Sequence, residues 1–255
     1  MINNCNSVIN TNTNPCIEQH KKCGNMKRPF IFFDLGQTLI NEWDFIDFFD
    51  KKLLELINGF GGRIDRRNYI TLKNNIIKNR LIGNGGLDEL IITICRIILP
   101  IGYDKIILKK IKPDLLDGIR KLVCLNYGAK KVVEKLSQYH ELGLISNEPK
   151  ETIEPLVNSN IFSLFNRISI LSKRKMKKPH WKLLDLINMT GFPASRCIMI
   201  GDRLDIDICP ANQLGMKTIR FTDSIFNLQS PKVKYEIPTH TVKKLEEITN
   251  VIQYI

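Results

Sequence analysis

The pattern of apolar and polar positions changes character twice along the chain. Short apolar runs that stop at polar residues occur near the start and again after residue 128. They lie at residues 30–33, 142–145, 168–171, 197–200 and 217–221. The later runs alternate with amphipathic stretches at residues 129–139, 151–158, 181–189 and 210–214. This alternation predicts an α/β fold in which a parallel sheet is covered by helices on both faces.

Between residues 44 and 126 apolar residues recur three and four positions apart, which predicts an all-helical block. Clusters of glycine separate its helices, and we expect Pro100 and Pro113 to close or open further helices. The stretch 87–99 is apolar on most sides and is expected to be the buried helix of the block.

Residues 1–27 have a different composition, rich in Asn, Thr and Lys, and are expected to form a flexible tail. They contain no apolar run like that of a signal peptide or membrane anchor. Cys5, Cys16, Cys23 and His20 lack the close pairing typical of structural zinc sites, so no zinc is expected there.

The overall composition narrows the class of protein only broadly. The chain has 255 residues, 43% of them hydrophobic, and a formal net charge of +12. That charge suits anionic partners, but many basic residues lie on predicted amphipathic helices such as 66–80, and no nucleic-acid-binding motif is present. No run reaches the roughly 18 apolar residues of a membrane span, and the odd number of cysteines indicates no disulfide framework. We expect a soluble cytoplasmic protein, and the oligomeric state is not indicated.

The candidate chemistry lies where the predicted strands end. Asp34 follows the first strand, Ser146 and Asn147 the second, a basic run at 173–178 the third, and Asp202 the fourth. Ligands of parallel sheets bind at the carboxyl ends of the strands, so we expect these groups to converge. Two carboxylates can hold Mg²⁺, while a hydroxyl and a lysine stabilise charge on a transferring phosphoryl group.

These residues also carry a family resemblance. Residues 32–39 (FFDLGQTL) resemble the first motif of the haloacid dehalogenase-like superfamily, and residues 144–147 resemble its second motif. Lys178 and Pro179 resemble the third motif, and residues 200–207 (IGDRLDID) are similar to the fourth. The match spans residues 30 to about 250 in the order of the family.

The resemblance implies a magnesium-dependent hydrolase on a Rossmann-like, three-layer core. By it, Asp34 is the nucleophile and a metal ligand, the Gly36 carbonyl and Asp202 are further ligands, and Asp207 supports the metal. Residues 28–44 and 128–255 would form the core, and residues 45–127 a helical cap that shields the site.

The same resemblance assigns the substrate contacts. Ser146 and Lys178 would hold the phosphoryl group, and Thr38 and Asn147 would contact the substrate. Thr38 would also brace the loop. The expected substrate is a small phosphorylated metabolite.

One position departs from the phosphatase pattern of the family. Its phosphatases carry a second Asp two residues after the nucleophile, as general acid and base, and this chain has Gly36 there. Asp44, Glu148 and His180 are candidates for a substitute acid. General acid–base catalysis contributes on the order of a hundred- to ten-thousandfold, so this loss bears on phosphomonoester hydrolysis.

Two alternatives therefore stay open. The chain could be a dehalogenase- or phosphonatase-type hydrolase, whose leaving groups need no such proton. Against a dehalogenase, Asp202 and Asp207 keep the arrangement of the metal-dependent members. The other alternative is a family member that has lost turnover and binds an anion only.

Overall fold

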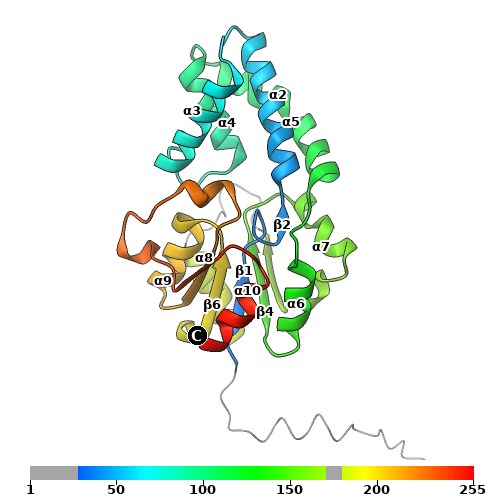
Figure 1. Ribbon diagram of the computed structural model, residues 1–255, viewed down its shortest axis with the longest axis vertical. Coiled ribbons are helices and arrows are strands. Elements are labelled where there is room, and N and C mark those ends of the chain that lie inside the picture. Colours follow the sequence, from blue (N-terminus) through cyan, green and yellow to red (C-terminus); the bar gives the residue numbers. More distant parts are fainter. Residues whose placement is uncertain (1–27, 171–179) are drawn as a thin grey trace, which may run out of the picture.

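A computed structural model describes residues 28–170 and 180–255 (Figure 1). The predicted tail at residues 1–27, with its cysteines and His20, lies outside the described residues, as does the basic run with Lys178. No helix in the described part of the chain is long and apolar enough to cross a membrane.

The core is one six-stranded parallel sheet. Its strands are β1 (Phe30–Phe33), β4 (Leu142–Ser146), β5 (Arg167–Ile170), β6 (Cys197–Gly201), β7 (Lys217–Phe221) and β8 (His240–Val242). Their spatial order is β5-β4-β1-β6-β7-β8, and each neighbouring pair is parallel. The predicted α/β fold class is confirmed. The sequence prediction missed β8, which is a short edge strand with one buried residue.

Alternate residues of the central strand pack into separate apolar clusters on the two faces of the sheet. Phe30 and Phe32 join one cluster with Leu183 of α8, whereas Ile31 and Phe33 join the other. This division follows from the alternation of side chains along a strand. The covering helices are α6 (Ala129–Ser137), α7 (Glu154–Asn158), α8 (His180–Thr190), α9 (Cys209–Gln213) and α10 (Glu247–Val251).

Four helices form an insert that stands beyond the carboxyl ends of the strands (Figure 1). They are α2 (Trp43–Gly59), α3 (Arg66–Asn79), α4 (Leu87–Ile98) and α5 (Tyr103–Leu122), and we call them the helical insert. The chain enters through β2 (Ile40–Asn41) and leaves through β3 (Cys124–Leu125), which pair antiparallel. The two connections between core and insert are thus tied together as a short ribbon, which the predicted all-helical block did not include.

One of two expectations about the helices of the insert was wrong. Pro113 does not end a helix but lies inside α5, where it is exposed, so water can solvate the carbonyl that its missing N–H leaves without a helical donor. The stretch expected to be the buried helix of the insert forms α4, in which Ile91 and Ile94 pack inside and exposure is confined to Arg96 and Ile97.

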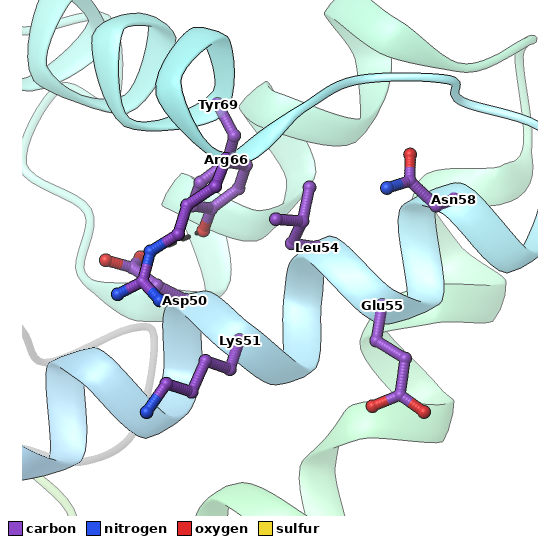
Figure 2. Close-up of a pocket in the computed structure, with 7 residues that line it drawn as sticks. All are labelled: Asp50, Lys51, Leu54, Glu55, Asn58, Arg66 and Tyr69. Atoms are coloured by element: carbon purple, nitrogen blue, oxygen red, sulfur yellow. Dashed lines mark hydrogen bonds between the residues drawn. The ribbon is translucent and has the colours of Figure 1, made fainter.

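A buried polar group joins α2 to α3 in the insert. The Tyr69 hydroxyl donates to Asp50 Oδ1 (3.0 Å), and Lys73 forms an ion pair with the same carboxylate. Burial, followed by the charge of Asp50, raises the pKa of Tyr69, so the phenol remains a donor. Figure 2 shows Asp50 and Tyr69 of this group among the residues that line a pocket of about 250 Å³, together with Arg66. Tyr69 and Lys73 both contact the Asp50 carboxylate, and these contacts join two helices, so we assign the group a structural role.

Short helical segments complete the core. Residues 151–158 were predicted as one helix but form a 3-10 turn, Lys150–Ile153, followed by α7. Pro155 explains the break, because it has no N–H to donate to the carbonyl four residues earlier. Other 3-10 segments are Phe162–Leu164, Ala194–Arg196, Ile225–Leu228, Lys234–Glu236 and Ile252–Tyr254, and Leu204–Ile208 is a π-helix.

Candidate active site

Asp34 lies at the carboxyl end of the central strand β1. Its backbone N–H donates to the Ile200 carbonyl (2.8 Å), which extends the pairing of β1 with β6 by one residue. The chain then turns sharply, with the N–H groups of Leu39 and Ile40 both donating to the Leu35 carbonyl. Asp34 is 8% exposed and lines a cavity at this edge of the sheet. The turn therefore fixes a carboxylate at the centre of the sheet edge.

Asp202 and Asp207 come from the end of the neighbouring strand β6. The Asp207 carboxylate accepts a hydrogen bond from the Arg203 N–H (3.1 Å), which folds the π-helix back over the strand end. Gly201 is required here, because a Cβ at this position would lie 2.6 Å from Asp207 Cγ. The close approach of glycine and carboxylate brings Asp207 back beside Asp202.

The three aspartates form a cluster that fits a divalent cation. Carboxylate oxygens of Asp34, Asp202 and Asp207 lie within 4.8 Å of one another, and all three residues are buried. Asp202 Oδ2 is buried without a hydrogen-bond partner. Burial, then the charges of Asp34 and Asp207, raises the pKa of Asp202 well above its usual value, and a hydrogen bond with Ser224 only partly opposes this. Mg²⁺ prefers such oxygen ligands and would relieve the repulsion.

The strand β4 ends beside this cluster. Ser146 is fully buried, and its Oγ accepts a hydrogen bond from the Glu148 N–H (3.0 Å). Asn147 and Glu148 line the cavity that contains Asp34. Lys178, the remaining predicted phosphate ligand, lies outside the described residues.

Thr38 occupies a different place from the other predicted substrate contacts. It is fully buried and does not line the cavity. Its carbonyl accepts a hydrogen bond from Asn126 Nδ2 (3.2 Å), at the ribbon between core and insert. Its position suits a bracing role for the loop more than contact with a substrate.

The cavity, about 470 Å³, lies between the core and the helical insert. The core wall comprises Asp34, Gly36, Gln37, Glu42, Asn147, Glu148, Pro149, Asp202, Arg203, Ile206, Ile225 and Phe226. The insert wall comprises Phe45, Ile46, Ile77, Ile82, Asn84, Gly85, Gly86, Leu87, Asp88, Glu89, Leu90, Lys112, Leu115, Leu116 and Ile119. The core wall is rich in carboxylates and the insert wall is mainly apolar.

Glu42 is a wall residue that the sequence analysis did not single out. It lies between β2 and α2, is buried, and forms a hydrogen bond with Gln37. Burial raises its pKa well above the usual value, and the charges of Glu148, Asp202 and Asp34 raise it further. In the sequence Glu42 looks like an ordinary charged residue before a helix, so no local signal distinguishes it.

The three candidates for a substitute acid are placed differently. Asp44 is exposed and does not line the cavity. His180 begins α8, and its side chain is outside the described part of the structure. Glu148 reaches Gly36, since a Cβ at position 36 would lie 3.1 Å from Glu148 Oε1. Gly36 does not have a positive φ, so its backbone conformation does not require glycine; the neighbouring Gln37 is the residue of this loop in the left-handed region (φ 49°).

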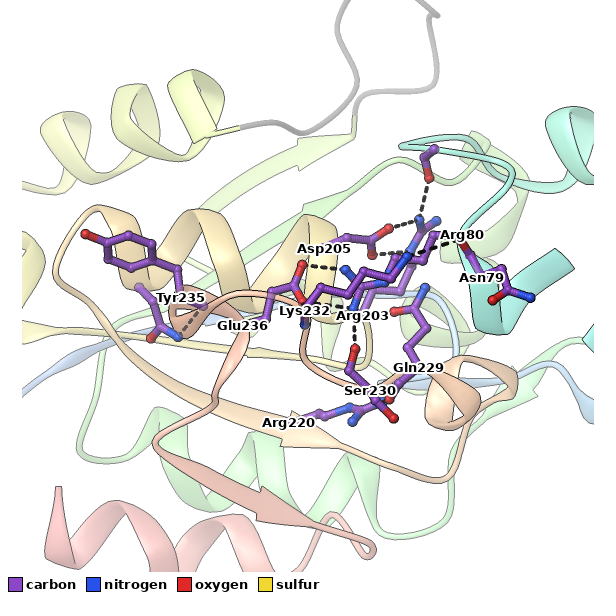
Figure 3. A network of polar contacts seen from close by, with 12 residues as sticks. Asn79, Arg80, Arg203, Asp205, Arg220, Gln229, Ser230, Lys232, Tyr235 and Glu236 are labelled. Atoms are coloured by element: carbon purple, nitrogen blue, oxygen red, sulfur yellow. Dashed lines mark hydrogen bonds and ion pairs between the residues drawn. The ribbon is translucent and has the colours of Figure 1, made fainter. Parts of the chain in front are cut away.

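Arg203 links the core wall to the insert wall. Its guanidinium donates to the carbonyls of Gly85 (2.7 Å) and Gly83 (2.9 Å), which belong to the loop between α3 and α4. It also pairs with Asp205 through two hydrogen bonds and lies 4.5 Å from the centre of the Phe226 ring. Figure 3 shows Arg203 and Asp205 together within this network. Arg203 thus fixes the loop between α3 and α4 to the core wall of the cavity.

A second arginine strengthens the same junction. Arg80, at the C-terminal end of α3, forms an ion pair with Glu236 and donates to the Ser230 carbonyl (2.8 Å) (Figure 3). Lys232 contributes a weaker contact to the Asn79 carbonyl (3.3 Å). The end of α3 is therefore fixed to the segment that follows β7.

Comparison with known proteins adds family and fold. The family model for haloacid dehalogenase-like hydrolases matches residues 31–221. A glyceraldehyde 3-phosphate phosphatase of Methanocaldococcus jannaschii is 24% identical over 235 residues, which cover 88% of this chain and 96% of that protein.

Two solved structures share the fold. The Bacillus subtilis HAD-hydrolase YfnB, bound to magnesium, has a TM-score of 0.62 at 21% identity and covers 89% of this chain and 99% of its own. A predicted phosphoglycolate phosphatase of Haemophilus somnus has a TM-score of 0.67 at 18% identity, with the same coverage. The chain belongs to the haloacid dehalogenase-like hydrolase family.

Proposed function

We propose that this haloacid dehalogenase-like hydrolase is a magnesium-dependent phosphatase that cleaves small phosphate monoesters with Asp34 as its nucleophile. One observation carries the proposal. The buried cluster of Asp34, Asp202 and Asp207, with its partnerless Asp202 oxygen, meets the cavity between core and insert, which Asp34 and Asp202 line. Three mutually repelling carboxylates in such a place are costly without a cation, and a phosphoryl group completes the shell of Mg²⁺.

The proposed roles follow from position. Mg²⁺, held by Asp34 and Asp202 with the Gly36 carbonyl and supported by Asp207, would neutralise charge on the phosphoryl oxygens. The Asp34 carboxylate attacks phosphorus from the end of β1 and forms an aspartyl phosphate, which water then hydrolyses. The Ser146 hydroxyl can donate to a phosphoryl oxygen while it accepts from the Glu148 N–H. Lys178 would complete the phosphate site, and the support for this role is its sequence motif.

The cavity limits the substrate. Its volume of about 470 Å³ fits a small metabolite, and the mainly apolar insert wall suits a leaving group with some hydrocarbon surface. The cations on its described walls are already engaged, because Lys112 pairs with Asp88 (3.4 Å) and Arg203 with Asp205. A substrate with one phosphate and little additional charge fits these walls best.

Hydrolysis that needs no proton on the leaving group is the second candidate, and Gly36 is the observation that favours it. A dehalogenase or a phosphonate hydrolase would use the same Asp34. A protein that only binds an anion would use the same three aspartates to hold Mg²⁺, but Asp34 would not attack the bound group.

A substrate screen tests these possibilities. The purified full chain is incubated with phosphate monoesters, a phosphonate and a 2-haloacid, each with Mg²⁺ and with a chelator, beside an Asp34→Asn control. We expect turnover of phosphate monoesters that requires both Mg²⁺ and Asp34. Turnover confined to the phosphonate or the haloacid would favour the second candidate. Binding of Mg²⁺ and phosphate without any turnover would identify an anion-binding protein.

A further inference from the structure

The space beside Gly36 is filled by another residue of the chain. A Cβ at position 36 would lie 3.1 Å from Oε1, 3.3 Å from Cγ and 3.4 Å from Cδ of Glu148. All three nearest neighbours of that point therefore belong to one carboxyl-bearing side chain. Gly36 is two residues after Asp34, so this carboxyl group, which comes from the segment after β4, lies against the loop that follows the nucleophile.

Local structure holds Glu148 in this place. Its N–H donates to the hydroxyl of Ser146, at the end of β4, so the backbone is anchored to the sheet on one side. On the other side, the Pro149 carbonyl accepts from the Thr152 hydroxyl (2.6 Å) and starts a 3-10 turn. Glu148 lines the cavity together with Asp34 and Asp202. The backbone is thus anchored on both sides of Glu148, and its carboxyl group lies beside Gly36 on the wall of the cavity that Asp34 also lines.

Resting on the proposed function, we propose that Glu148 is the general acid and base of this hydrolase, in place of the carboxylate that Gly36 lacks. In the first half-reaction an Asp34 oxygen bonds to phosphorus as the bond to the leaving oxygen breaks. The carboxylic acid of Glu148 gives its proton to that oxygen, which releases an alcohol. In the second half-reaction the Glu148 carboxylate takes a proton from water as the water oxygen bonds to phosphorus. The bond to Asp34 breaks, and phosphate, Asp34 and protonated Glu148 result.

Glu42 is the rival for this role, because it is also a carboxyl group on the cavity wall. It comes from the junction of β2 and α2 and is engaged with Gln37. It is not among the atoms nearest to the position-36 Cβ, all of which belong to Glu148. We therefore assign Glu42 no proton transfer, and a Glu42→Gln variant provides the comparison.

The test uses leaving groups of different basicity at one fixed pH with saturating Mg²⁺. A nitrophenyl phosphate has a leaving group that departs without a proton, whereas an alkyl phosphate requires one. Glu148→Gln should lower kcat/KM on the alkyl phosphate by about a hundredfold or more, and on the aryl phosphate by less than about tenfold. The retained aryl activity shows that the variant is folded. Glu151→Gln, three residues away, is the matched control and should change neither value.

A rescue experiment tests the position directly. Glu148→Ala removes the carboxyl group and opens the space beside Gly36. The double variant Glu148→Ala/Gly36→Asp should hydrolyse the alkyl phosphate at least tenfold faster than Glu148→Ala alone, because the new carboxyl group enters the vacated volume. Gly36→Asp alone should lower activity, because its Cβ would be 3.1 Å from Glu148 Oε1.

The outcomes separate this proposal from the function on which it rests. If the unmodified chain hydrolyses neither ester, both fail. If it hydrolyses both and Glu148→Gln affects them equally or not at all, the role of Glu148 is overturned while the phosphatase assignment stands. Selective loss of alkyl activity in Glu42→Gln instead would move the role to Glu42.

Discussion

The two walls of the central cavity differ in what they are made of and in how they arise. The core wall carries carboxylates from the ends of β1, β4 and β6, of which Asp34 and Asp202 are buried and Glu148 is half-buried. The insert wall comes from helices and presents mainly apolar side chains such as Leu115 and Ile119. A carboxylate-rich wall can hold a cation and a phosphoryl group, whereas an apolar wall can only exclude water and contact hydrocarbon.

Under the proposed function, the contrast predicts that reaction and substrate selection are divided between two parts of one chain. The register of the sheet fixes where each strand ends, and it therefore fixes the positions of the core-wall residues at the strand ends. The insert joins the core through the β2–β3 ribbon and the contacts of Arg203 and Arg80. Changes on the core wall should therefore alter the chemistry, and changes on the insert wall should alter substrate preference.

The strongest test of this division is the nucleophile. Asp34→Asn should lower phosphatase activity at least a thousandfold, because the isosteric amide cannot attack phosphorus. The melting temperature of the variant, measured beside its initial rates, should stay within a few degrees of the unmodified chain. Residual activity above about one per cent, shown not to come from contamination, would rule out Asp34 as the nucleophile.

Asp202 tests the electrostatics of the core wall through stability. In a chelator, Asp202→Asn should raise the melting temperature by about 2–6 °C, because it removes one of three repelling carboxylates. The unmodified chain should be stabilised by millimolar Mg²⁺, and the variant much less. Differential scanning calorimetry with and without Mg²⁺ measures both effects. Asp117→Asn, on the exposed side of α5, is the control, and an equal Mg²⁺ response in both variants would count against the metal site.

Arg203 tests the link between the walls. Arg203→Lys keeps the charge but cannot reproduce the bonds to Gly83, Gly85 and Asp205 together. We expect the free energy of unfolding to fall by about 1–3 kcal/mol and KM to rise more than kcat falls. Urea unfolding and initial rates provide these values. The exposed Arg120→Lys should change neither, and an unaffected KM in Arg203→Lys would show that the insert does not depend on this contact.

Leu116 tests the insert wall by itself, with the smallest expected effect. It lies on α5, lines the cavity and is 38% exposed, so a polar residue is tolerated there. Leu116→Lys should shift preference about five- to tenfold toward esters with an anionic leaving group over those with a hydrocarbon one. Leu116→Met is the control. Equal loss on both kinds of ester would mean that this wall does not select.

Much of the core wall could be predicted because its signals are local. Each short apolar run that stops at a polar residue indicates a buried strand and the residue at its end. Parallel pairing then brings Asp34, Ser146 and Asp202 to one edge, as the register of Phe33 with Leu144 and Ile200 shows. The convergence of these candidate residues at one edge of the sheet was therefore accessible from residue order alone.

The helical insert was predicted in outline but not in detail. Periodicity indicates helices, yet Pro113 remains inside α5 because water can solvate the carbonyl left without its N–H donor. The segments β2, β3 and β8 are two or three residues long and are too short to carry a recognisable alternation. Their pairing partners, and not their own residues, define them as strands.

The sequence by itself determined the fold class, the order of the strands along the chain and the carboxylates at their ends. Only the tertiary structure decided which distant groups complete the site. Glu148 fills the space beside Gly36, and Arg203 holds Gly85 across 118 positions of the chain. Glu42 enters the cavity from a junction that has no motif. The physical reason is that such contacts depend on packing between the sheet edge and the insert, which leaves no periodic pattern in either segment.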